Sequence, residues 1–316
     1  MKMNRRKVLN IIAASGGVMI GGVFVQKAIA EDKIKIGFSQ CTLNHPWRVA
    51  QVDVNKAWAD ENMKDVDLII TDGNNDAGKQ VSDVESLLSQ GIKVLILSPL
   101  TADALTPIAK QAMDAGVLVI TLDRKVNTPV TCHLGAFNLP IGAAAAAFAA
   151  TKLGGKGAII ELQGTAGASA TTDRNKGFMD ELAKTPGLTV AASQNCDYTR
   201  DKAVKFMEDM LQRFPEGQIH CVYAHNDEMA LGAIQVLEGA NRLKDVVVIG
   251  IDGQNNAIEA VAAGKLGATF TYPYCAPDGA QYAYKLAKGE KVDAEVVLNS
   301  VAITAENAKD MIGKGF

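Results

Sequence analysis

Polar side chains suited to a hydroxylated ligand stand directly after several short apolar runs of the chain. Asp123 and Arg124 follow the run 117–122, and Asp252 follows the run 246–251. Hydroxyl groups both donate and accept hydrogen bonds, and carboxylate, amide and guanidinium groups are their complementary partners. Aromatic rings cover the apolar C–H face of such a ligand. The pattern therefore predicts a site for a small polyhydroxylated molecule, to which other runs add His45, Trp47, Arg48, Asp76, Arg174 and Asn226.

Simpler structural roles compete with ligand binding for some of these residues. Asp76, Asp173 and Asp227 precede predicted helices, where an aspartate side chain caps the first backbone N–H groups. Asp123 and Arg124 also fit an internal ion pair. The four histidines lack metal-ligand spacing, so core or surface positions are their default, with His45 excepted because of its loop. The sequence leaves these alternatives open.

Motifs for metal binding or catalysis are missing or incomplete. Asp72, Asn74 and Asp76 resemble the opening of a calcium loop, but Ala77 stands where that loop needs glycine. The small-residue segment 164–170 lacks the lysine of a phosphate-binding loop, and no GxSxG or GxGxxG motif follows a predicted strand. We therefore predict a binding protein without metal, cofactor or catalytic residues, and not an enzyme.

The elements that position the polar residues alternate regularly from residue 33 onward. Continuous apolar runs suit parallel strands covered on both faces, and their alternation with helical segments implies right-handed crossovers. The predicted strands are 34–39, 66–71, 94–98, 117–122, 158–162, 188–192, 221–224 and 246–251. The predicted helices are 47–62, 79–90, 104–115, 141–153, 173–182, 202–213 and 228–238.

Two blocks of this alternation, roughly 33–136 and 137–268, predict an α/β fold with two doubly wound parallel-sheet domains. No Pro- or Ser-rich linker separates the blocks, which favours a hinge over a flexible tether. Ligands of open α/β sheets bind beyond the carboxyl ends of the strands. The polar residues stand at those ends.

The first thirty residues have the three parts of an export signal. Residues 1–7 are basic, residues 8–25 are apolar, and Ala28-Ile29-Ala30 is a small-x-small cleavage site. A membrane anchor is the alternative, because 8–25 reaches the minimum spanning length. The cleavage site and the paired glycines weigh against it. We expect a periplasmic protein with no stable membrane insertion after cleavage, with the Sec and Tat routes both open.

Charge and cysteine content narrow the partners further. Residues 1–30 hold five of the 32 basic residues and no acid, so the remainder has 27 basic against 35 acidic residues, a net charge of −8. A mature chain with this net negative charge lacks the basic surface that nucleic-acid binding needs. The five cysteines are widely spaced and form no CxxC motif, which favours free thiols, while one long-range disulfide stays open.

Four motifs together resemble the periplasmic sugar-binding proteins of ABC importers, in the ribose/galactose-binding class, over nearly the whole mature length. The resemblance implies a type I periplasmic binding protein fold. Within the class, the segments GFSQ at 37–40, ELQGT at 161–165 and VYAHND at 222–227 are closest to galactofuranose-binding proteins. The four motifs are LNHPW at 43–47, LDR at 122–124, YAHNDEMALGA at 223–233 and GIDG at 250–253.

The resemblance also implies roles for individual residues. Asp123 and Arg124 would bind hydroxyls from the first domain, and Arg174, Asn226 and Asp252 from the second. Trp47 and Tyr198 would stack on the sugar, and His45 would make a polar contact. Arg48 stands where ribose-binding proteins carry an aromatic residue but agrees with the galactofuranose type, whereas Tyr272 stands at a hinge position where they carry glutamine. The predicted ligand is a monosaccharide, galactofuranose-like or a related furanose or pentose.

The same resemblance predicts three chain crossings between the domains. The expected division is a signal peptide at 1–30, a first domain of 31–136 with 272–298, and a second of 137–271 with 299–316. The expected protein is a monomer that closes about its hinge and is recognised by ABC importer membrane subunits. A sugar sensor for a chemoreceptor or another signalling partner is the alternative function.

Overall fold

The structure has two β-sheets covered by helices, and the first sheet contains the first five strands of the described chain and one strand from near its end. The structure is a computed structural model that describes residues 33–316; the predicted signal peptide lies outside the described residues. The sheet has the order β11-β5-β4-β3-β1-β2 and all its pairs are parallel. Its strands are β1 (Ile34–Gln40), β2 (Val66–Asp72), β3 (Val94–Ser98), β4 (Leu118–Leu122), β5 (Cys132–Gly135) and β11 (Glu295–Val297). Its helices are α1 (Pro46–Asn62), α2 (Ala77–Ser89), α3 (Ala102–Asp114) and α9 (Asp278–Ala287).

The second sheet repeats this order with one antiparallel edge strand. The order is β12-β10-β9-β8-β6-β7, and β12 pairs antiparallel with β10. Its strands are β6 (Gly157–Gln163), β7 (Leu188–Asn195), β8 (Cys221–Ala224), β9 (Val247–Ile249), β10 (Ala268–Phe270) and β12 (Ala302–Thr304). Its helices are α4 (Asn138–Lys152), α5 (Ser169–Leu182), α6 (Arg200–Arg213), α7 (Asp227–Gly239), η1 (Leu243–Asp245), α8 (Asn255–Ala262) and α10 (Ala308–Met311).

The continuous apolar runs form the centre of each sheet because both of their faces are covered. In β3, Val94 and Ile96 belong to one hydrophobic cluster, and Leu95 and Leu97 belong to another. Successive side chains of a strand point to opposite faces, so each face of the sheet has its own core. The predicted doubly wound α/β fold is confirmed, with the antiparallel β12 as its one departure from fully parallel sheets.

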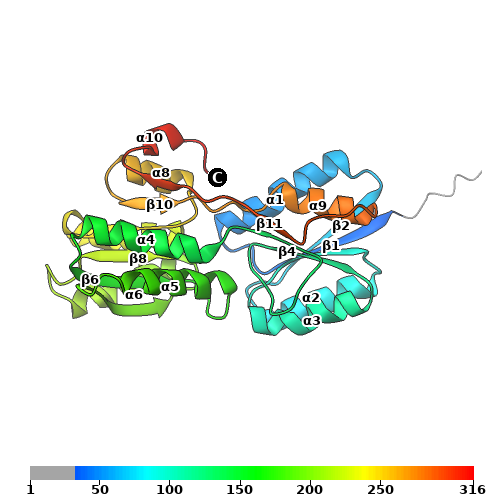
Figure 1. Cartoon of the computed structure of the whole chain (residues 1–316), viewed down its shortest axis with the longest axis horizontal. Helices are drawn as coiled ribbons and strands as arrows, with labels where there is room; N and C mark the ends of the chain where they lie inside the picture. Colours follow the sequence, from blue (N-terminus) through cyan, green and yellow to red (C-terminus); the bar gives the residue numbers. More distant parts are fainter. Residues whose placement is uncertain (1–32) are drawn as a thin grey trace, which may run out of the picture. The chain divides into compact units, whose positions relative to one another are not determined.

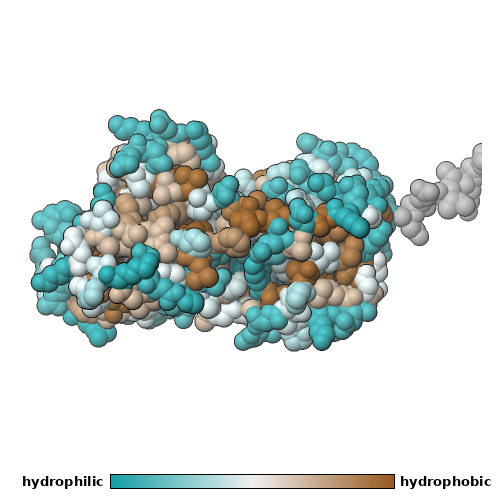
Figure 2. Space-filling view, in the orientation of Figure 1, coloured by the Kyte–Doolittle hydropathy of each residue, from teal (hydrophilic) through white to brown (hydrophobic). Residues whose placement is uncertain are grey.

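The chain passes three times from one sheet to the other. The passages lie between β5 and α4, between β10 and α9, and between β11 and β12. Residues 33–316 form one compact unit. Apolar residues where the three passages begin, including Phe137, Phe270 and Val297, line a groove there. Figure 2 shows hydrophobic side chains gathered near the middle of the face that Figure 1 presents, with hydrophilic ones around them.

Helices α4 and α5 lie side by side on the second sheet in unusually close contact (Figure 1). A Cβ atom on Gly142 would stand 2.2 Å from the carbonyl oxygen of Arg174, and one on Gly177 would stand 2.0 Å from that of Leu139. Only glycine permits this approach. The close packing sets Arg174 of α5 beside Asn138, the first residue of α4.

Candidate functional site

The site lies beyond the carboxyl ends of strands from both sheets. In the first sheet, His45, Trp47 and Arg48 follow β1, and Asp123 and Arg124 follow β4. In the second sheet, Asn226 follows β8, Asp252 follows β9, and Tyr198 follows β7. The strand order reverses between β1 and β3 and between β6 and β8. Such switch points open a crevice in which ligands of α/β sheets bind.

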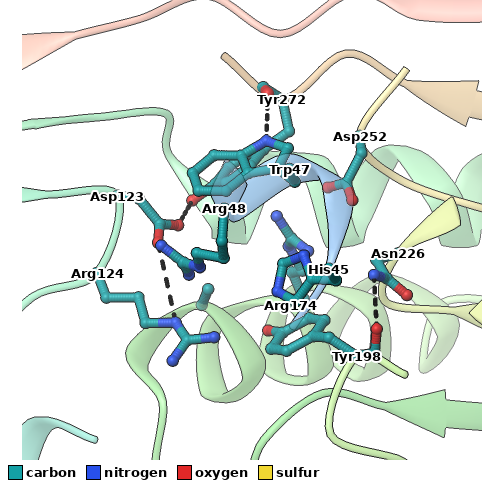
Figure 3. Close-up of a pocket in the computed structure, with 11 residues that line it drawn as sticks. His45, Trp47, Arg48, Asp123, Arg124, Arg174, Tyr198, Asn226, Asp252 and Tyr272 are labelled. Atoms are coloured by element: carbon teal, nitrogen blue, oxygen red, sulfur yellow. Dashed lines mark hydrogen bonds and ion pairs between the residues drawn. The ribbon is translucent and has the colours of Figure 1, made fainter. Parts of the chain in front are cut away.

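Ten of the eleven residues predicted from the sequence line one pocket (Figure 3). The cavity between their side chains is small, about 20 Å³, which is room for about one water molecule. Ala170 is the one lining residue that the sequence did not indicate, since a small apolar side chain carries no chemical signal. The lining residues are His45, Trp47, Arg48, Asp123, Arg124, Ala170, Arg174, Tyr198, Asn226, Asp252 and Tyr272.

Asp76 does not line the pocket. Its side chain is the N-cap of α2, with Oδ1 accepting a hydrogen bond of 2.8 Å from the Lys79 backbone N–H. The capping alternative therefore describes Asp76. For Asp173 that alternative is wrong, because α5 begins at Ser169 and Asp173 lies within the helix.

Asp227 is not a cap either. The N-cap of α7 is the preceding residue, Asn226, whose Oδ1 accepts a hydrogen bond from the Met229 backbone N–H at 3.0 Å. Asp227 is buried and accepts hydrogen bonds from the Gln254 backbone N–H and the Thr269 hydroxyl. Asn226 thus combines helix capping with a place in the pocket wall, and its Nδ2 donates to the Tyr198 carbonyl.

Asp123 is the centre of the polar contacts on the first-sheet side. Its Oδ2 lies 2.5 Å from Arg48 Nη2 and 3.8 Å from Arg124 Nε, and its Oδ1 accepts a hydrogen bond of 2.7 Å from the Tyr272 hydroxyl. Burial raises the pKa of this carboxyl, but Arg48, Arg124 and the Tyr272 hydrogen bond outweigh burial and hold the pKa below its usual value. Asp123 is therefore ionised, and its closer ion-pair partner is Arg48 rather than the predicted Arg124.

Arg174 is the matching group on the second-sheet side. It is 2% exposed, its Nε donates to Asn138 Oδ1 at 2.8 Å, and its Nη1 donates to the His225 carbonyl. Its guanidinium stands 4.3 Å over the Tyr272 ring. Burial raises the pKa of Asp252 well above its usual value, and the opposing effect of Arg174 does not cancel it. Asp252 can therefore hold a proton, so that it donates as well as accepts.

Four polar atoms of the wall are buried and have no hydrogen-bond partner within residues 33–316: His45 Nδ1, Arg48 Nε, Arg124 Nε and Asp123 Oδ2, the last of which is ion-paired with Arg48. Buried polar groups in proteins are nearly always paired, so unpaired ones beside a pocket indicate a polar ligand. Burial, together with Arg48 and Arg124, lowers the pKa of His45 to about 3. His45 is thus neutral at neutral pH and presents both a donor and an acceptor nitrogen.

Three residues of the pocket wall also have a strained backbone. Asp123, Tyr198 and Asp252 have φ angles of 66°, 62° and 132°, in the region that favours glycine. Strained non-glycine residues persist where the surrounding structure holds them, and they cluster at ligand sites. Over residues 33–316, no group of three or more His, Cys, Asp or Glu side chains could hold a metal ion. None of the described helices is long and apolar enough to span a bilayer.

Two doubly wound sheets around a buried polar pocket define a two-lobed binding protein for a small ligand. Residues 36–291 match the family model described as a periplasmic binding protein domain, and the chain belongs to this family. The family predicted from the sequence motifs is therefore confirmed.

Relatives of the chain have the names of binding proteins, not of enzymes. The ribose import binding protein of Salmonella typhimurium is 36% identical over 299 residues, covering 93% of this chain and 96% of the relative. The galactofuranose-binding protein of Escherichia coli is 33% identical over 248 residues, covering 75% and 76%. The solved fructose-binding periplasmic domain of a hybrid two-component system has a TM-score of 0.84 and 33% identity, covering 89% of this chain and 94% of that one.

Proposed function

We propose that this protein is exported to the periplasm, binds one monosaccharide in the pocket and delivers it to the membrane subunits of an ABC importer. The observation that carries the proposal is the set of buried guanidinium, carboxyl and amide groups that converge on one pocket between the two sheets. Trp47 and Tyr198 add aromatic surface for the C–H side of a sugar. The relatives named for ribose and galactofuranose support the same ligand class.

The proposed ligand is galactofuranose-like, or a related furanose or pentose. Arg48 supports the galactofuranose type, because it replaces the aromatic residue expected in ribose-binding proteins. Isothermal titration calorimetry with a panel of furanoses and pyranoses tests the proposal, with hydrolysis of each sugar followed in parallel. Micromolar or tighter binding of one sugar, without turnover, is the expected result; no binding across the panel would reject it.

Hinge closure is the proposed mechanism. The proposed lobes are 31–136 with 272–298 and 137–271 with 299–316, preceded by a signal peptide at 1–30. This division is supported by β11 and α9, which pack with the first sheet, and by β12, which pairs in the second. Closure is driven by contacts that the sugar makes with both lobes at once. The closed monomer then presents one surface to the importer.

A second candidate function is sugar sensing for a chemoreceptor or another signalling partner. The related periplasmic domain of a hybrid two-component system favours it. Deleting the protein in its host separates the two functions: uptake of the labelled sugar stops if the protein serves an importer, whereas only the sugar response is lost if it serves a sensor.

A further inference from the structure

The hydroxyl group of Tyr272 is fully used by the protein itself. It donates to Asp123 Oδ1 at 2.7 Å and accepts from Asn138 Nδ2 at 3.0 Å. A phenol hydroxyl can donate only one hydrogen bond, and the bond to Asp123 already uses that capacity. Asp123 Oδ2 is in turn engaged by Arg48. Tyr272 therefore lines the pocket without a free proton for a ligand.

The Tyr272 ring is also held in one orientation. The Trp47 ring lies 5.5 Å away at a tilt of 30°, and the Arg174 guanidinium stands 4.3 Å over the Tyr272 ring. Trp47 Nε1 donates a hydrogen bond of 2.9 Å to the Tyr272 carbonyl, drawn as a dashed line in Figure 3. Tyr272 is 4% exposed. A ring fixed in this way presents carbon, not oxygen, to the ligand.

We propose that Tyr272 determines specificity by forming an apolar wall, so that the pocket selects a monosaccharide whose carbon at this wall bears hydrogen or methyl instead of hydroxyl. This inference rests on the proposed function. A ligand hydroxyl at the wall would lose its hydrogen bonds to water and find no new partner. A deoxy carbon has no such hydrogen bonds to lose. Added hydroxyls are rejected only modestly by apolar walls, so we expect a preference of roughly 10- to 100-fold.

A polar side chain in place of the ring would change the wall. Glutamine or histidine at position 272 would offer a ligand hydroxyl a donor and an acceptor. The Tyr272→Phe variant loses the phenol oxygen that pairs with Asp123 and Asn138, but it keeps the ring and therefore the apolar wall.

The test compares parent monosaccharides with their monodeoxy analogues by calorimetry. D-Galactose with D-fucose, L-mannose with L-rhamnose, and D-ribose with its 2- and 5-deoxy forms are suitable sets. The proteins are the wild type, the polar replacements Tyr272→Gln and Tyr272→His, the ring-preserving Tyr272→Phe and the control Tyr274→Phe. Tyr274 is a matched control because it stands two residues away, packs edge-on against Phe316 and does not line the pocket.

We expect the wild type, Tyr274→Phe and Tyr272→Phe to bind at least one deoxy analogue 10-fold or more tightly than its parent, and Tyr272→Gln to bring that ratio to about one or below. Tyr272→His decides the outcome if Tyr272→Gln does not fold. A wild type that binds every parent at least as tightly as its analogues would overturn the inference, as would an unchanged ratio in folded Tyr272→Gln or Tyr272→His. No binding of any sugar would instead reject the proposed function.

Discussion

The imidazole of His225 donates a hydrogen bond from Nε2 to Glu161 Oε1 at 3.1 Å, and both side chains are buried. The Gly164 backbone N–H points to His225 Nδ1, which identifies Nε2 as the protonated nitrogen. Burial lowers the pKa of His225, and the Glu161 carboxylate only partly opposes it. The carbonyl of His225 accepts from Arg174, so this pair holds one wall of the pocket in place.

Replacing Glu161 is expected to weaken sugar binding although Glu161 does not line the pocket. In Glu161→Gln, the side chain keeps its size but loses its charge and part of its capacity to accept from His225, Asn175 and Ser193. We expect about 10-fold weaker binding and an unfolding free energy lower by about 1–3 kcal/mol, from calorimetry and urea denaturation. In the control Glu295→Gln, only an exposed ion pair with Lys125 is lost, and a change within about 0.5 kcal/mol is expected. Equal effects of the two substitutions would contradict the role of Glu161.

Arg124→Ala is expected to lower sugar affinity by about 30- to 1,000-fold, because a desolvated, charge-assisted contact costs about 2–4 kcal/mol. Arg124 Nη1 also donates to the Leu100 carbonyl at 2.8 Å, so the alanine variant loses some stability as well. Arg124→Lys separates these effects, since it keeps the charge but not the planar fork. Calorimetry on variants with native circular dichroism is the measurement, and wild-type affinity in Arg124→Ala would remove Arg124 from the binding site.

Reducing agent is expected to leave the melting temperature unchanged. All five cysteines are free and buried. Burial raises the pKa of the Cys132 thiol to about 11 and of Cys196 to about 12, so both stay protonated and unreactive at neutral pH. Thiol titration should find few reactive groups in the native protein and all five after unfolding. A melting temperature about 10 °C lower with dithiothreitol would indicate a structural disulfide instead.

His133 is expected to make stability depend on pH in one direction. Burial and the Lys125 ammonium lower the pKa of His133 to about 4, whereas the pKa of an unfolded histidine is about 6.5. Between these values the unfolded chain binds a proton that the folded chain does not, so the contribution of His133 is complete above pH 6.5 and is lost as the pH falls toward 4.

The comparison with His133→Gln isolates this effect from the other titrating groups. The unfolding free energy of the wild type relative to the variant should fall by up to about 1.4 kcal/mol per pH unit between pH 6.5 and 4. Urea denaturation at pH 7.5, 6, 5 and 4.5 measures it. A constant difference across this range would show that His133 titrates alike in both states.

The sequence predicted the parts of the molecule in which local pattern and burial agree. The predicted strand 94–98 is β3, and Asp123 and Asp252 follow strands as expected. The short strands β5, β10, β11 and β12 were not predicted, because runs of only three or four residues carry no clear period.

Residues that act through other residues escaped prediction for a different reason. Asn138 and Glu161 have ordinary positions in the chain, and only the folded structure brings them to Arg174 and His225. Asp76 was predicted as a site residue although it is a helix cap, because a position between a strand and a helix suits both roles equally. The sequence does not show which side chains already form hydrogen bonds within the folded protein.

Sugar binding is expected to change tryptophan fluorescence through Trp47 alone. Trp47 is 3% exposed, lines the pocket and donates to the Tyr272 carbonyl. Trp58 is partly buried and packs edge-on against Tyr284, beside the core of the first sheet. Trp58 stands eleven positions after Trp47 in α1, about 16 Å along the helix, so the sugar does not reach it.

Two variants and one independent measurement complete this test. Trp47→Phe should abolish the ligand-dependent emission change and Trp58→Phe should keep it, with sugar binding followed by calorimetry in both. An unchanged emission response in Trp47→Phe would place Trp47 outside the site. Small-angle scattering follows closure separately, because a hinge motion reduces the radius of gyration whichever fluorophore is present. Since Trp47 touches Tyr272 at the second passage between the sheets, closure and emission should saturate at the same sugar concentration; tight binding without any change in scattering would reject the closing hinge.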